Sequence, residues 1–238
     1  MISRRVFLLL TGSALLAPSF SWAANEVPVV LDHILLGCND LQRGIAFVEE
    51  HTGVRATFGG VHPGRGTQNA LLSLGERHYL EIIAPDPKQN QAKSSGPPQF
   101  ARLKDFAEPR LIGWAAHPGD LQAFAEKLRA AGFAFTGPTP GSRARPDGRM
   151  LHWKTLNLAD DHHGVLPFFI EWSSGSVHPS TDAPQGCRIE TFAIAAPDPA
   201  ALRKILQQLS LDAPVEQGDR SQLRTRITGP HGSLEISS

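Results

Sequence analysis

Two segments constrain the fold of this chain more than any other feature. Residues 31–37 and 77–83 both have the length and composition of β-strands, with apolar side chains on both faces. Because side chains alternate across a strand, His33 shares a face with Leu31 and Leu35, and Glu81 shares one with Tyr79 and Ile83. A sheet that is apolar on both faces must be covered on one side and enclose something on the other.

The first 23 residues have the pattern of an export signal. Arg4 and Arg5 precede an apolar run, and small residues at positions 21 and 23 suit cleavage before Ala24. The pattern Ser-Arg-Arg-x-Phe-Leu is typical of twin-arginine signals, but paired arginines also occur in general secretory signals, so both routes stay open. Either route predicts a periplasmic protein, and the apolar run is too short to serve as a stable membrane anchor.

The charge of the chain argues against several classes of partner. Basic and acidic residues number 23 each, and cleavage of the leader would leave 21 against 23, a net charge of −2. Nothing in this balance attracts nucleic acid or an anionic membrane surface. The two cysteines, Cys38 and Cys187, form no Cys-x-x-Cys pair; they could form a disulfide in an oxidising compartment or remain as two buried thiols.

The order of predicted elements repeats along the chain. In the first unit a strand at 31–37 precedes a helix with an N-cap at Asn39-Asp40 and an end at Gly53. A glycine-rich turn region at 58–67 and strands at 69–74 and 77–83 complete it. We interpret this unit as β-α-β-β-β.

Two further copies of this order follow a polar loop at 88–99. The second has strands at 110–116, 150–158 and 166–172, a helix from Asp120 to Gly132, and a Pro/Gly-rich stretch at 137–148. The third has strands at 188–195, 222–227 and 233–236 and a helix that begins at Asp198-Pro199. Alignment of the strand ends places His33, Gly113 and Thr191 in one column, and Glu81, Glu171 and Glu235 in another.

Tandem βαβββ units that open on Leu31-Asp32-His33 and close on Tyr79-Leu80-Glu81 resemble the vicinal oxygen chelate superfamily, and specifically its glyoxalase-like domain proteins. Residues 66–69 and 166–172 are further landmarks of the resemblance. It implies an α+β fold in which tandem βαβββ modules form a cupped mixed sheet around a pocket. We therefore predict a signal peptide at 1–23, a two-module glyoxalase-like domain at 24–175 and a third βαβββ-like module at 176–238.

The resemblance also implies a site. Metal-using members take ligands from the first and last strands of each module, which here gives His33, Glu81 and Glu171, with Glu81 and Glu171 also as catalytic residues. The fourth position falls on Gly113, which has no side chain. Imidazole and carboxylate ligands suit Zn, Ni, Mn or Fe. The residues expected to line the substrate pocket are Thr67, Asn69, Tyr79, Arg145, His152 and Trp153.

Two functions stay open at this point. In the first, a divalent metal supports lyase, isomerase or dioxygenase chemistry on a small oxygenated metabolite. In the second, the protein binds or sequesters a small molecule without a metal, and an arginine such as Arg65, Arg143 or Arg145 pairs with Glu81, whose burial would otherwise be costly. Gly113 favours the second. The third module could support packing or a homodimer in either case.

Overall fold

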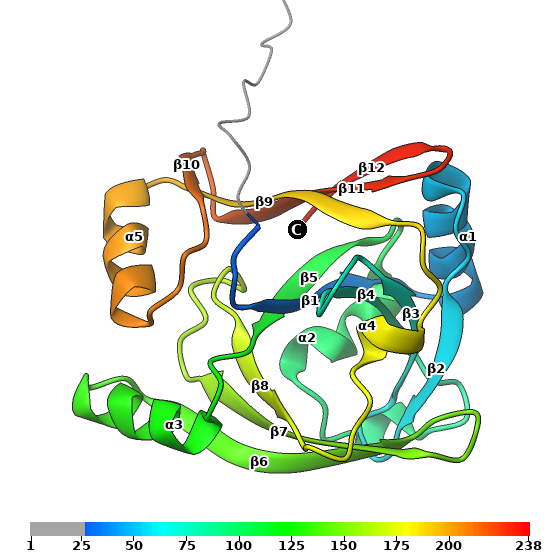
Figure 1. The fold of residues 1–238 in the computed structure, drawn as a ribbon, viewed down its shortest axis with the longest axis horizontal. Helices are drawn as coiled ribbons and strands as arrows, with labels where there is room; N and C mark the ends of the chain where they lie inside the picture. Colours follow the sequence, from blue (N-terminus) through cyan, green and yellow to red (C-terminus); the bar gives the residue numbers. More distant parts are fainter. Residues whose placement is uncertain (1–26) are drawn as a thin grey trace, which may run out of the picture.

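The computed structural model describes residues 27–238, so the leader predicted at 1–23 lies outside the described residues. Within 27–238, no helix is both long and apolar enough to cross a membrane. The central feature is a curled, mixed sheet of eight strands in the order β2-β3-β4-β1-β5-β8-β7-β6 (Figure 1). A curled mixed sheet combined with helices is the α+β, cupped-sheet architecture that the sequence predicts, and this prediction is confirmed.

The first half of the sheet comes from the first repeat. Its elements are β1 (Leu31–Gly37), α1 (Leu41–Thr52), β2 (Thr57–His62), β3 (Thr67–Ser73) and β4 (Tyr79–Pro85). Strand β4 returns parallel to β1, which puts the opening and closing strands of the repeat side by side. The side chains of Ile34, Leu36, Leu80 and Ile82 pack on the covered face, in the hydrophobic core.

The second half repeats this arrangement. After the short helices Gln91–Lys93, α2 (Pro98–Ala101) and Leu103–Asp105 come β5 (Arg110–Ala116), α3 (Leu121–Ala130), β6 (Phe135–Ala144), β7 (Met150–Leu158) and β8 (Phe168–Trp172). The N-caps predicted for α1 and α3 are present, because Asp40 and Asp120 each accept a hydrogen bond from the backbone N–H three residues further on.

Strand β6 differs from the expectation of a turn-rich stretch at 137–148. Pro138 and Pro140 lie inside this strand, which forms one outer edge of the sheet. An edge strand tolerates proline because the backbone N–H groups on its outer side have no neighbouring strand to bond, so the N–H that proline lacks is not required there. The sheet curls so far that β6 approaches the other edge strand, β2: a Cβ on Gly60 would lie 2.6 Å from the backbone oxygen of Ala144.

The last quarter of the chain forms a second sheet outside the first. Its elements are α4 (Pro179–Asp182), β9 (Arg188–Ala196), α5 (Pro199–Gln208), β10 (Val215–Gln217), β11 (Gln222–Gly229) and β12 (Gly232–Ser237). In Figure 1 this sheet lies along one side of the curled sheet, beside α1. The ring of Trp114 on β5 meets that of Phe192 on β9, with ring centres 5.0 Å apart, so one core joins the two sheets.

The third segment has the expected order of elements but a different strand order. In the first repeat the opening strand pairs with the closing strand, whereas the order here is β10-β9-β11-β12, so β9 and β12 are not neighbours. Thr191 and Glu235 therefore do not occupy the positions of His33 and Glu81. Cys38 and Cys187 are both buried and unpaired in the described chain, and burial raises the pKa of the Cys38 thiol to about 12.

Candidate functional site

The concave side of the curled sheet encloses a cavity of about 830 Å³. Strands from both halves of the sheet line it, as does the segment around α2. His33 on β1 and Tyr79 and Glu81 on β4 face this cavity, together with Leu35 and Ile83. This is the face that strand alternation predicts for them, and the apolar residues between them face the core.

The ring of His33 is fixed by its neighbour in sequence. His33 is 2% exposed, and its Nδ1 lies 2.7 Å from Oδ1 of the fully buried Asp32. Burial alone would raise the pKa of Asp32, but hydrogen bonds from His178 and His33 outweigh burial and hold this pKa well below its usual range. Because an ionised carboxylate only accepts, Nδ1 of His33 carries the proton. Nε2 of His33 then faces the cavity.

Asp32 is itself held by two residues, one at the end of β8 and one in the segment that follows it. Trp172 donates from Nε1 to Oδ2 of Asp32 at 3.1 Å, and Nε2 of His178 lies 3.2 Å from the same oxygen. The backbone N–H of Ser180 donates to Nδ1 of His178, so Nε2 of His178 is the protonated nitrogen that donates to Asp32. Supports of this kind orient a histidine that acts as a metal ligand.

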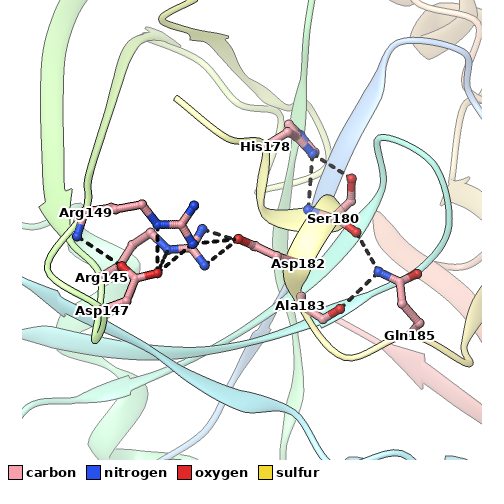
Figure 2. A network of polar contacts seen from close by, with 8 residues as sticks. All are labelled: Arg145, Asp147, Arg149, His178, Ser180, Asp182, Ala183 and Gln185. Carbon is pink, nitrogen blue, oxygen red and sulfur yellow. Dashed lines mark hydrogen bonds and ion pairs between the residues drawn. The ribbon is translucent and has the colours of Figure 1, made fainter. Parts of the chain in front are cut away.

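Contacts at both ends hold the segment that carries His178 in place. Figure 2 shows His178 bonded to Ser180, while Asp182 at the end of α4 pairs with Arg145 at 2.7 Å. The hydroxyl of Ser73 on β3 also donates to the backbone oxygen of Ser180. The segment therefore connects both halves of the curled sheet and brings His178 to Asp32.

Glu81 stands between two imidazoles. Its Oε2 lies 3.6 Å from Nε2 of His33, and its Oε1 lies 3.5 Å from Nε2 of His62 on β2. Asn69 on β3 donates to Oε1 at 2.6 Å and also lies 3.4 Å from Nε2 of His62. Because Asn69 donates to Nε2, the proton of His62 is on Nδ1, which bonds Thr67 at 2.9 Å. Nε2 of each ring therefore lies beside the same carboxylate, and Nε2 of His62 also accepts from Asn69.

The charges of this cluster follow from its surroundings. Burial would raise the pKa of Glu81, but His62, His33 and the hydrogen bond from Asn69 lower it below the usual value, so Glu81 is ionised at neutral pH. Burial lowers the pKa of His62 to about 4 against the pull of Glu81, so His62 is neutral. Within residues 27–238 no arginine forms an ion pair with Glu81. The ion pair between Glu81 and an arginine, which the metal-free alternative predicts, is therefore not present among these residues.

Glu171 does not lie with His33 and Glu81, contrary to its predicted role as a ligand and catalytic residue. Its neighbours Ile170 and Trp172 face the cavity, so Glu171 points to the opposite face of β8. There its Oε2 accepts from the backbone N–H of Leu121 at 2.7 Å, at the N-terminus of α3, and its Oε1 lies 3.4 Å from Nζ of Lys154. Glu171 caps a helix and satisfies a backbone donor.

We expect Glu171→Ala to lower the free energy of unfolding by about 1 kcal/mol, because the first turn of α3 loses an acceptor and a favourable charge. The measurement is urea denaturation of the mature protein. Glu126→Ala, on the exposed side of the same helix, is the matched control and should change stability by less than about 0.5 kcal/mol. Equal effects of the two changes would contradict the capping role.

Strand register shows why the alignment of Glu171 with Glu81 was wrong. In the first half Leu35, two residues after His33, pairs with Glu81. In the second half Ala115, two residues after Gly113, pairs with Phe168. Phe168 thus takes the place of Glu81, as Gly113 takes that of His33, and the second half of the sheet supplies neither ligand.

The predicted pocket residues divide into two groups. Asn69, Tyr79 and Trp153 line the cavity, and Tyr79 stacks on the ring of His33 with centres 4.4 Å apart. Thr67 is buried behind the cavity wall, where it holds His62. Arg145 and His152 do not line the cavity: Arg145 pairs with Asp182, and His152 is exposed at the surface. The prediction for these two residues was wrong.

The sequence prediction omitted two residues that the structure places in the site, His62 and His178. His62 lies in a glycine-rich stretch interpreted as a turn, although it ends β2 next to Thr67 in the sheet. In the sequence, the segment from Gly60 to His62 is compatible with a strand, and this was the signal that could have identified His62 as a site residue. No local signal marks His178, because it belongs to the connecting segment and meets Asp32 from 146 positions away.

Comparisons with known proteins agree with this fold. A family described as the glyoxalase-like domain matches residues 31–210. No curated protein matches the sequence. Among solved structures, a hypothetical protein from Staphylococcus aureus is 19% identical, with a TM-score of 0.60, over 87% of this chain and 84% of that chain. Methylmalonyl-CoA epimerase from Mycobacterium tuberculosis is 22% identical, with a TM-score of 0.46, over 65% of this chain and 94% of that chain.

At these identities the structural likeness shows the fold alone, whereas the family match covers most of the chain and the whole curled sheet. The opening Leu31-Asp32-His33, the closing Tyr79-Leu80-Glu81 and the strand order agree with that match. The chain belongs to the glyoxalase-like domain family of the vicinal oxygen chelate superfamily.

Proposed function

We propose that the protein is a metal-dependent enzyme of the lyase, isomerase or dioxygenase type that acts on a small oxygenated metabolite in the cavity. The observation that carries this proposal is the approach of two imidazole nitrogens, Nε2 of His33 and Nε2 of His62, to the ionised carboxylate of Glu81. Imidazole nitrogens and carboxylate oxygens are the ligands that divalent cations share in catalytic sites. The cluster is therefore suited to hold one.

The donor chemistry of the cluster fits a divalent ion. Ligands that share one ion through bonds of about 2.1 Å lie roughly 3.4 Å apart in a tetrahedral shell. The contacts of Glu81 with His33 and His62, at 3.6 and 3.5 Å, are close to this spacing. Among residues 27–238, no three His, Cys, Asp or Glu side chains are arranged to hold a metal ion as they stand. Binding would therefore need a small shift of these side chains, after which His33, Glu81 and His62 would hold the ion, with positions left for oxygen atoms of a substrate.

The remaining chemistry follows from the residues themselves. When bound, a divalent ion supplies Lewis-acid polarisation of a ligand oxygen, a contribution of several kcal/mol. Asp32 keeps the proton of His33 on Nδ1, and Thr67 does the same for His62. Glu81, ionised at neutral pH, is the group able to accept a proton from a substrate, through a carboxylate oxygen that does not bind the ion. The aromatic rings of Tyr79 and Phe168 reduce the access of water to His33.

A metal-free binding protein is the second candidate. Gly113 and Phe168 favour it, because the second half of the sheet provides no ligand. In this case the cavity would hold a small molecule by hydrogen bonds to Asn69 and the two histidines. The two candidates differ in one measurable property, the metal content of the purified protein.

We expect about one divalent ion per chain in the mature protein purified without chelators, measured by elemental mass spectrometry. His33→Ala, His62→Ala and Glu81→Ala should each lose most of it, because each removes a ligand. Glu171→Gln is the matched control and should keep it, because Glu171 lies on the other face of the sheet.

The same preparation tests the proposed periplasmic location. Osmotic shock should release the protein, and its intact mass should correspond to a chain whose first residue is Ala24. Absence of metal in the wild type, even after soaking in Zn²⁺, Ni²⁺, Mn²⁺ or anaerobic Fe²⁺, would reject the enzyme proposal and leave the metal-free candidate.

A further inference from the structure

Arg143 is a buried cation without a partner. It lies on β6, is 3% exposed and lines the cavity. Within residues 27–238 its guanidinium donates no hydrogen bond and forms no ion pair, and its Nη1 is buried with no partner at all. Arg145, two residues further on, forms ion pairs with Asp147 and Asp182. The isolation of Arg143 is therefore not shared by the next arginine, which lies just beyond the end of β6.

The local backbone keeps Arg143 in this position. Gly60 on β2 has a φ of +142°, and a Cβ there would lie 2.8 Å from Nη1 of Arg143. A side chain at position 60 would therefore displace the guanidinium. Glycine at this position lets the two edge strands of the curled sheet approach and leaves Arg143 enclosed between them.

An enclosed charge of this kind carries a cost that a ligand can remove. Placing a cation in a poorly hydrated site without a direct partner costs several kcal/mol. Burial lowers the pKa of Arg143 below its usual value, although the attraction of Glu81 acts in the opposite direction, and the two side chains form no ion pair. An oxyanion in the cavity could contact Arg143 directly. The flat guanidinium matches a carboxylate best, since two parallel hydrogen bonds can form.

We propose that Arg143 is the anion-binding residue of this cavity and that the molecule bound there carries a carboxylate, so that the substrate class is a small hydroxy or oxo acid. The carboxylate pairs with Arg143, and the remaining oxygens of the acid face His33, His62 and Glu81. The contact of the carboxylate with Arg143 is inferred from Arg143 alone. The contacts of the remaining oxygens with His33, His62 and Glu81 rest on the proposed function.

Matched pairs of acid and amide test the inference, because they share shape and differ in charge. The probes are lactate, pyruvate and 3-hydroxybutyrate, each beside its amide, at constant ionic strength. A ligand at ten times its Kd stabilises a protein by about 1.4 kcal/mol, which for a chain of this size raises Tm by roughly 3–6 °C. We expect this rise with at least one acid and with none of the amides.

Variants assign the effect to its residue. Arg143→Gln should abolish the rise, Arg143→Lys should keep part of it, and Arg145→Gln should keep all of it. An equal response to an amide, a full response in Arg143→Gln, or no response to any acid in the wild type would overturn the inference.

Metal content, measured on the same samples, separates the two proposals. Metal that is retained in Arg143→Gln while the acid response is lost supports both. An acid response that depends on Arg143 in a wild type free of metal would reject the proposed function and leave this inference standing. Metal in the wild type without a charge-dependent response would reject this inference and leave the proposed function standing.

Discussion

Asp32→Asn is expected to weaken metal binding by about 10–100-fold, although Asp32 does not face the cavity. The carboxylate fixes the proton of His33 on Nδ1 and so keeps Nε2 free to bind. An asparagine can present its NH₂ group to His33, which favours the other tautomer and turns Nε2 into a donor. Affinity is measured by competition with a chelator of known strength.

The same change should lower the free energy of unfolding of the metal-free protein by about 3 kcal/mol. Asp32 is fully buried and accepts from His33, Trp172 and His178, and loss of its charge weakens all three hydrogen bonds. Urea denaturation in the presence of chelator measures this effect.

Asp86→Asn is the matched control. Asp86 is also buried, but its carboxylate accepts from Lys88 and Gln89, away from His33. Asp86→Asn should lower stability and leave metal affinity unchanged. Unchanged metal affinity in Asp32→Asn would contradict the role of Asp32 as the residue that orients His33.

The dependence of His33 on Asp32 links the site to distant parts of the chain. His178 reaches Asp32 from the segment between the curled sheet and the second sheet, and Trp172 reaches it from the end of β8. The geometry of His33 on the first strand is thus fixed by residues encoded some 140 positions later. The first repeat carries His33, His62 and Glu81, and later parts of the chain supply the groups that orient His33.

The sequence predicted those features that depend on local pattern. Strand alternation correctly placed His33 with Leu35, and Glu81 with Tyr79 and Ile83, on the cavity face. The N-caps at Asp40, Asp120 and Asp198 follow from a short side chain at a helix start and are all present.

Features that depend on pairing between strands could not be predicted from local sequence pattern. Glu171 resembles Glu81 in its sequence surroundings, but a shift in strand register turns a side chain to the other face. Phe168 occupies the matching position, and only the pairing of Ala115 with Phe168 reveals it. The different strand order of the third segment has the same cause, because identical element orders can pair in more than one way.

Gly113→His is expected to increase metal affinity by about a hundredfold. Gly113 takes the position in the second half that His33 takes in the first, and it borders the cavity. A Cβ there would meet no atom within 4 Å, and the backbone of Gly113 does not lie in the left-handed region. An imidazole at this position can therefore enter the cavity without displacing a neighbour.

The expected size follows from ligand number. Four ligands of a structural zinc site contribute about 10–16 kcal/mol together, so each contributes roughly 3 kcal/mol, which corresponds to about a hundredfold in affinity. Chelator competition on the wild type, Gly113→His and Gly113→Ala measures it. Gly113→Ala is the control for backbone effects and should bind metal as the wild type does.

The result also tests where the ion lies. If His33 and Glu81 hold it on the side of the cavity that faces β5, a histidine at position 113 completes the set and affinity rises. Combining Gly113→His with His33→Ala should then restore part of the binding that His33→Ala removes, because one imidazole replaces the other across the strand pair. No gain in either background would show that the ion, if bound, lies on the His62 side of Glu81, out of reach of β5.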